Sequence, residues 1–165
     1  MKISPPTTEL LAEKTARPYL KLQLGQNIPA VLSMNNTQEV LTVASRKITP
    51  MPNLPECFIG LLNQRSRIFW VINFPQILGL PPVDINLQQY SLVIIHANKI
   101  PLGLVVPAIK GVVRLVTAEI QSPIGNVAPD LVPYLQGCLL QENQILLVLD
   151  PEAIVNAPIL SFHSS

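Results

Sequence analysis

The chain has 165 residues and a formal net charge of +1, and charged residues make up only 13% of it. A near-neutral chain has no overall attraction to nucleic acid, and 48% hydrophobic residues are typical of a folded protein. The length is that of one domain or two small subdomains. Because so little charge keeps the surface soluble, we expect a partner to cover part of it.

The cysteines and the sequence ends indicate a cytoplasmic protein. Cys57 and Cys138 lie far apart and form no C-x-x-C pair, so we expect two buried, reduced thiols. Residues 1–17 hold acidic residues and two adjacent prolines, and they predict a flexible arm without a secretory signal. The uncharged run 68–83 is interrupted by three prolines, which excludes a membrane-spanning helix there.

Short strands are predicted along the first half of the chain. Residues 19–24 alternate between apolar and polar side chains, and residues 28–33 return after a turn. Asn36 is predicted to cap a short helical turn, with Glu39 in the capping-box position. Further strands are expected at 48–51, 57–62 and 68–74, with a short helix from Pro75 to about Gly79.

The second half repeats the pattern. Residues 90–97 and 100–106 predict a hairpin around Asn98-Lys99, and 135–140 and 144–149 predict another through Glu142-Asn143. Residues 109–116 predict a strand in which Gly111 marks a bulge, and residues 121–133 form a proline-rich loop. Asp150 is predicted to cap a final helix that begins at Pro151. Many short strands and 17 prolines favour an all-β barrel or sandwich.

One hairpin carries an unusual concentration of charge. The strands 57–62 and 68–74 are joined by Asn63-Gln64-Arg65-Ser66-Arg67, and between Ile68 and Asn98 the only charged residue is Asp84. Arginine beside apolar surface is typical of interface anchors. The alternative is a solvated turn whose arginines only keep a sheet edge soluble.

Charge is also distributed unevenly between the two halves of the chain. No Lys or Arg follows Arg114, whereas five acidic residues do. The first half holds Arg46, Lys47, Arg65 and Arg67 with Glu56 as the only acid among them. Opposite ends of the molecule could therefore carry opposite charge, which would suit head-to-tail contacts.

The sequence gives little support for an enzymatic function. The two histidines, His96 and His163, have no spacing suited to a metal, and we predict no metal site. The chain contains no glycine-rich phosphate loop and no G-x-S-x-G elbow. Trp70 is predicted to pack in the core, and 5% aromatic residues weaken any single-stranded nucleic-acid platform. An enzyme with scattered site residues stays open as an alternative.

In their order and spacing, these segments resemble the CheW family, the coupling proteins of chemosensory arrays. The resemblance covers about residues 19–156. It is carried by the following pieces: Ile48-Thr49-Pro50, Pro52-Asn53-Leu54-Pro55, Phe58-Ile59-Gly60, Asn63-Gln64-Arg65, Val71-Ile72-Asn73-Phe74, Leu78-Gly79-Leu80, residues 90–95, Leu102-Gly103-Leu104-Val105-Val106, Tyr134-Leu135-Gln136-Gly137 and residues 145–150.

The resemblance implies an all-β fold of two SH3-like β-barrel subdomains with a groove between them, over residues 18–157, followed by a tail at 158–165. It implies a non-enzymatic cytoplasmic adaptor without cofactors. Its partners would be the regulatory domain of a CheA-type histidine kinase and the cytoplasmic tip of a methyl-accepting receptor, with no nucleic acid and no membrane insertion. The alternative is a stand-alone β-barrel that binds a ligand or another protein.

Two sets of site residues follow from the resemblance. Arg65, Asn63, Glu39 and Gly60 are expected at the kinase-binding surface, where an arginine–carboxylate pair would hold a fixed fork geometry. Leu92, Ile94 and Val112 are expected to line the receptor groove, which would accept an amphipathic helix.

The chain also departs from the family pattern. The turn N-L-R-G is N-Q-R-S here, V-I-D-L is V-I-N-F, and Pro107 replaces a frequent acidic residue. The turn and the stretch Glu39-Val40-Leu41 are more similar to coupling proteins of pilus-driven surface motility, including phototaxis, than to flagellar ones.

Overall fold

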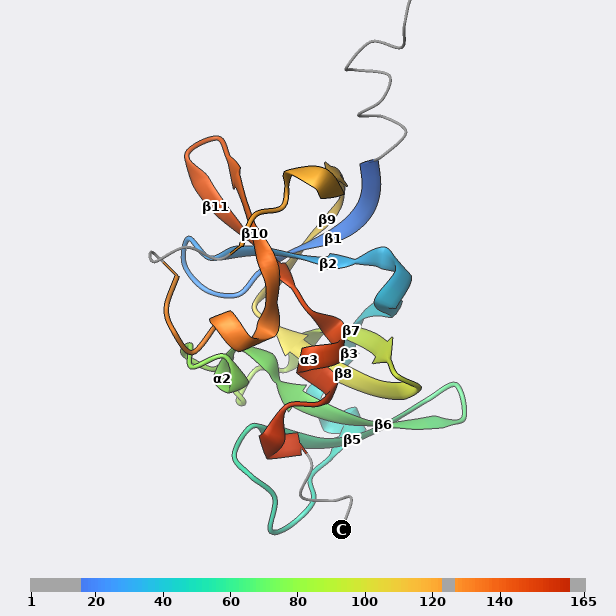
Figure 1. Cartoon of the computed structure of the whole chain (residues 1–165). Coiled ribbons are helices and arrows are strands. Elements are labelled where there is room, and N and C mark those ends of the chain that lie inside the picture. Colours follow the sequence, from blue (N-terminus) through green and yellow to red (C-terminus); the bar gives the residue numbers. More distant parts are fainter. Residues whose placement is uncertain (1–15, 123–126, 161–165) are drawn as a thin grey trace, which may run out of the picture.

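The computed structural model describes residues 16–122 and 127–160, and these fold mainly as β-strands in two curled sheets (Figure 1). The five-stranded sheet has the order β10 (Leu135–Gln141), β11 (Gln144–Leu149), β2 (Pro29–Ser33), β1 (Ala16–Gln23), β9 (Ala108–Val116). The six-stranded sheet has the order β3 (Thr37–Ala44), β7 (Gln89–Ala97), β8 (Ile100–Val106), β6 (Arg67–Asn73), β5 (Phe58–Gln64), β4 (Ile48–Thr49).

Short helices connect the strands. The α-helices are α2 (Phe74–Ile77) and α3 (Pro151–Val155), and the 3-10 turns are η1 (Met34–Asn36), η2 (Ser45–Lys47), η3 (Thr117–Glu119) and η4 (Val132–Tyr134). The expected fold of two small β-barrels is confirmed, and we call them the five-stranded and the six-stranded barrel. The five-stranded barrel takes its strands from both ends of the chain, and the six-stranded barrel lies between them in sequence.

In the five-stranded barrel, a short antiparallel β-bridge connects the segment after β9 to β10. The backbone groups of Gln121 and Cys138 exchange hydrogen bonds of 2.8 and 2.7 Å. Gly137 permits this approach, because a Cβ atom there would collide with the carbonyl oxygen of Gln121. The bridge places η3 beside β10.

Tight turns close the predicted hairpins. The turn pairs Arg65-Ser66, Asn98-Lys99 and Glu142-Asn143 all have positive φ values between 48° and 65°. Two central residues with positive φ define a type I′ turn, whose twist matches that of the flanking strands. The charged hairpin is therefore longer than predicted, since Gln64 and Arg67 already pair in the ladder.

Two glycines mark bulges. The register of β1 and β9 shifts at Gly111, which has φ 106°, and this confirms the predicted bulge. The register of β5 and β6 shifts between Phe58 and Gly60. A Cβ atom at Gly60 would collide with the carbonyl oxygen of Thr49 on β4, so glycine is required for the contact of these strands.

One hydrophobic core joins the two barrels. It includes Leu22 and Leu32 from the five-stranded barrel, Ile72 and Ile95 from the six-stranded barrel, and Ile154 from α3, all without exposed area. Each barrel also has its own interior cluster. Strand β7 is therefore covered on both faces, by the barrel interior on one side and by the shared core on the other.

Three local predictions are corrected. Ser33, and not Asn36, caps η1 by accepting a hydrogen bond of 3.2 Å from the Asn35 amide, and Glu39 lies in strand β3. Strand β1 begins at Ala16, within the predicted arm, whose residues 1–15 lie outside the described segments. In the predicted tail, Leu160 is buried in the shared core, and residues 161–165 lie outside the description.

Candidate functional site

The tip of the β5–β6 hairpin carries most of the residues expected at the kinase-binding surface. Arg65 Nε lies 3.8 Å from Glu39 Oε1, with side-chain exposures of 79% and 22%. The closer partner of Glu39 is Gln64, whose Nε2 donates a hydrogen bond of 2.9 Å to Glu39 Oε2. The expected fork of Arg65 on Glu39 is thus wrong: a single long contact holds them, and the guanidinium faces solvent.

Other residues complete this surface, which we call the arginine tip (Glu39, Gln64, Arg65, Arg67 and Ile68). Asn63 is exposed and pairs with Ile68, whose side chain is 65% exposed. The Arg67 guanidinium carbon lies 5.6 Å from the centre of the Phe69 ring. Sequence reasoning missed Gln64 and Ile68, although the change from N-L-R-G to N-Q-R-S put a hydrogen-bond donor next to the arginine.

Gly60 does not belong to the exposed tip. It is buried, and its contact with Thr49 fixes the position of β5 against β4. Gly60 can therefore influence docking only by holding the hairpin in place. The structure brings Glu39 and Arg65 together. Asn63 is exposed on the same hairpin but pairs with Ile68, and Gly60 has a supporting position in β5.

The expected receptor groove needs correction. Leu92 and Ile94 have no exposed area and pack inside the six-stranded barrel, so they cannot line a surface in this structure. Val112 is 58% exposed on β9. It pairs with Leu20, a residue of the shared core, so its side chain lies on the face of β9 that is turned toward the seam between the barrels.

A separate depression lies between the barrels at the β1–β2 turn. Its volume is about 640 Å³, and it is lined by residues 24–28, the segment 81–91 and the end of β8. The loop in this segment is held from below by Asn73, which donates a hydrogen bond of 2.8 Å to the Val83 carbonyl and accepts one of 2.9 Å from the Val83 amide. Tyr90 donates a hydrogen bond of 2.7 Å to the Ile85 carbonyl.

The titratable groups with a clear pKa shift in the described residues are two cysteines and one tyrosine. Cys57 and Cys138 are free and buried, and burial raises the pKa of both thiols. Burial, with a smaller effect of the Asp84 charge, raises the pKa of Tyr90. Within residues 16–122 and 127–160, no three His, Cys, Asp or Glu side chains are grouped to hold a metal. In the same segments, no helix is long and apolar enough to cross a membrane.

The described residues thus form two small β-barrels on one shared core, with hairpin tips exposed at the surface. The model of the CheW-like domain family matches residues 18–158, and the chain belongs to this family.

Known relatives agree with this assignment. The chain is 24% identical over 115 residues to the chemotaxis protein CheW of Thermotoga maritima, covering 70% of this chain and 74% of that protein. It is 26% identical over 111 residues to chemotaxis protein CheW of Bacillus subtilis, covering 67% and 70%. The crystal structure of the scaffolding protein TtCheW from Thermoanaerobacter tengcongensis superposes with a TM-score of 0.71 at 19% identity, covering 82% of this chain and 89% of that one.

Proposed function

We propose that this chain is a non-enzymatic cytoplasmic adaptor of a chemosensory array, which couples methyl-accepting receptors to a CheA-type histidine kinase. Its arginine tip would bind the regulatory domain of the kinase, and the seam beside Val112 would receive the helical tip of the receptor. The observation that carries the proposal is one hairpin end that exposes both Arg65 and Ile68, where Gln64 holds Glu39 by a hydrogen bond.

The arginine tip has the composition of a docking anchor. Arg65 and Ile68 are mostly exposed, so they are available to a partner without any change in the fold. Glu39 is held by Gln64, which leaves the guanidinium of Arg65 free of a tight intramolecular fork. Arginine at the centre of an interface often contributes a large share of the binding free energy.

Val112 supports the receptor half of the proposal. An apolar side chain that is 58% exposed beside a shared core offers an amphipathic helix a place to bury its apolar face. Receptor binding can change kinase activity only if the receptor and the kinase occupy different faces of the adaptor. The arginine tip and Val112 meet this condition, because they lie on different barrels.

The kinase surface is tested by calorimetry with the regulatory domain of a candidate kinase. We expect micromolar binding that weakens by about 2 kcal/mol in Arg65→Ala. Arg46→Ala removes an exposed arginine of η2 and should bind as the wild type does. Unchanged binding by Arg65→Ala, with circular dichroism showing both variants folded, would remove the arginine tip from the kinase interface.

The receptor surface is tested with a fragment of the receptor's cytoplasmic tip. A charge placed in a desolvated apolar contact is costly, so Val112→Glu should weaken receptor binding at least about tenfold. The same variant should keep its affinity for the kinase domain. Leu140→Glu, on an exposed position of β10, is the matched control. Equal loss of receptor binding in both variants would contradict a site at Val112.

The variant turn Asn63-Gln64-Arg65-Ser66 and the stretch Glu39-Val40-Leu41 support an output in pilus-driven surface motility, including phototaxis. Deleting the chain from its host should then abolish directed surface movement. Intact surface responses with defective swimming responses would assign the chain to a flagellar system instead.

A further inference from the structure

The loop that precedes β7 exposes large apolar side chains although its backbone is firmly held. We call residues 81–88 the anchored loop, and within it Ile85 is 66% and Leu87 44% exposed. Hydrogen bonds to neighbouring elements fix it: Asn73 with Val83 at 2.8 and 2.9 Å, the Tyr90 hydroxyl with the Ile85 carbonyl at 2.7 Å, and the Ser45 amide with the Gln88 carbonyl at 2.8 Å. A loop that is already ordered loses little conformational entropy when a partner binds.

The depression between the barrels lies directly beside these exposed side chains. Leu87 forms part of its wall, together with Leu24, Ile28 and Val106. Its volume of about 640 Å³ leaves room for a large side chain from outside. One surface thus carries an exposed apolar side chain, Ile85, next to an apolar hollow.

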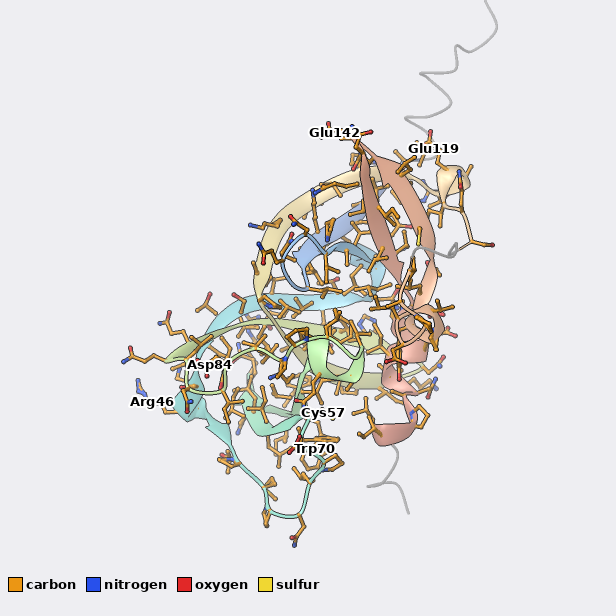
Figure 2. The ribbon with its side chains drawn as sticks, turned by 90° about the vertical axis from the view of Figure 1, so that its left-hand side faces the viewer. Arg46, Cys57, Trp70, Asp84, Glu119 and Glu142 are labelled. Atoms are coloured by element: carbon orange, nitrogen blue, oxygen red, sulfur yellow. The ribbon has the colours of Figure 1, made fainter. Side chains whose placement is uncertain are left out.

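The charged residues beside the anchored loop differ in sign on its two sides. The hydrogen bond from η2 to the end of the loop places the exposed Arg46 and Lys47 on one side. On the other side, Glu56 and Asp84 line a second depression together with Ile85. Figure 2 shows Arg46 and Asp84 at the same edge of the molecule. Within residues 16–122 and 127–160, neither Arg46 nor Glu56 belongs to an ion pair, so both charges are available to a partner.

We propose that two copies of this chain associate about a two-fold axis that passes through the anchored loop. In a two-fold contact a surface faces itself, so each of its features needs a complement on the same surface. The anchored loop meets this condition. Ile85 of each copy enters the depression beside the partner's Leu87, and Arg46 of each copy faces the partner's Glu56.

A lipid surface fits these residues less well than a second copy does. Asp84 and Glu56 would lie against anionic headgroups, which repel them, and a flat bilayer cannot fill a hollow. The paired contact closes on itself, so it stops at two copies.

The pair leaves the proposed kinase surface free. Strand β6 begins at the arginine tip and runs parallel to β8, whereas β7 is antiparallel to β8. The anchored loop precedes β7, so it lies at the end of the six-stranded barrel opposite the arginine tip. Both arginine tips of the pair therefore stay accessible, and the pairing does not rest on the proposed function.

The pairing is measured by sedimentation velocity on the purified full-length chain. The mean sedimentation coefficient should rise between about 10 μM and about 1 mM protein, the range expected of a small contact, and level off at the value of a dimer. Ile85→Glu puts a charge into the apolar contact and should raise the dissociation constant at least about tenfold. This variant should stay folded, because the Tyr90 hydroxyl bonds to the backbone of residue 85 and not to its side chain. Leu140→Glu, at an exposed position of β10, should pair as the wild type does.

Charge exchange tests the relative orientation of the two copies. Arg46→Glu and Glu56→Lys each place like charges against each other twice in a pair, so each variant alone should pair more weakly than the wild type. Mixed in equal amounts, they should recover pairing, because both contacts then join opposite charges.

Several results would overturn the proposal. A wild type that is monomeric at every concentration would do so and would leave the hollow surface to a different partner. Assemblies that grow beyond two copies would contradict a two-fold contact. An equal loss of pairing in Leu140→Glu and Ile85→Glu would remove the anchored loop from the contact, and a mixture of the two charge variants that stays monomeric would refute the orientation.

Discussion

Asn73 is the only buried polar side chain within residues 16–122 and 127–160. Its side-chain NH2 group donates to the Val83 carbonyl, and its side-chain oxygen accepts from the Val83 amide. These two hydrogen bonds resemble those between paired strand residues, and they fix the loop that lines the depression between the barrels. A carboxylate at this position could accept the Val83 amide but could not donate to the Val83 carbonyl. The departure from V-I-D-L to V-I-N-F therefore has a local physical reason.

We expect Asn73→Asp to lower the free energy of unfolding by about 2 kcal/mol at pH 7, since the Val83 carbonyl loses its donor and faces a buried charge. At pH 4 part of the loss should return, because a protonated carboxyl can donate. Urea denaturation at the two pH values measures both effects. Asn86→Asp, an exposed change in the same loop, should be nearly neutral, and equal costs at the two positions would refute the role of Asn73.

At the residue scale, sequence reasoning located the charged turn but misplaced the groove. The exposed positions of Arg65 and Asn63 could be predicted because a turn motif is local. Their role in binding stays a prediction. The prediction that Leu92 and Ile94 line a groove was wrong, because the exposure of a strand residue depends on which elements cover the strand. The run Leu92–Ile95 is continuously apolar, which is typical of a strand buried on both faces, so the sequence held a signal against its use as a surface.

At the element scale, the type I′ turn of the arginine tip has an unfavourable sequence. Such turns favour Asn-Gly, and here Arg65 and Ser66 both hold positive φ values that cost non-glycine residues energy. Residues kept in a strained conformation at an exposed site support a functional constraint on that turn.

Replacing Arg65-Ser66 by Asn-Gly should therefore raise the free energy of unfolding by about 1 kcal/mol. It should also weaken kinase-domain binding by about 2 kcal/mol, as Arg65→Ala does. Chemical denaturation and kinase-domain calorimetry on the same variant measure the two effects, and Asn98-Lys99→Asn-Gly controls for the turn type. A variant that is less stable than the wild type would show that the turn is not strained.

The hairpins could be predicted to within a few residues because apolar runs and turn residues are local signals. The order of the strands could not. The pairings of β2 with β11 and of β6 with β8 are parallel, and they join segments that are distant in the sequence. These pairings arise from burial of the shared core, to which both barrels contribute. The apolar periodicity of a single segment cannot predict them.

At the scale of the whole molecule, the shared core should make the two barrels unfold as one unit. Cys57 and Cys138 both belong to this core, and burial raises the pKa of their thiols. The unfolded chain therefore releases its thiol protons at a lower pH than the folded chain does. Stability from this source is complete below the ordinary cysteine pKa of about 8.5 and declines as the pH rises through and above it.

Urea denaturation from pH 7 to pH 10 should show this decline as a single transition at each pH. The double variant Cys57→Ala with Cys138→Ala should flatten the dependence and leave the effect of Tyr90, whose pKa is also raised. Two separate transitions would contradict a shared core. A pH dependence unchanged in the double variant would show that other groups cause it.

The interleaved order of the strands has a consequence for synthesis on the ribosome. Strands β1 and β2 leave the ribosome first, yet β9, β10 and β11, which complete their sheet, are made last. All six strands of the other barrel are translated in between. A nascent chain must therefore hold its first hairpin unpaired at both edges while the middle barrel forms, and that barrel then presents the apolar face on which the late strands assemble.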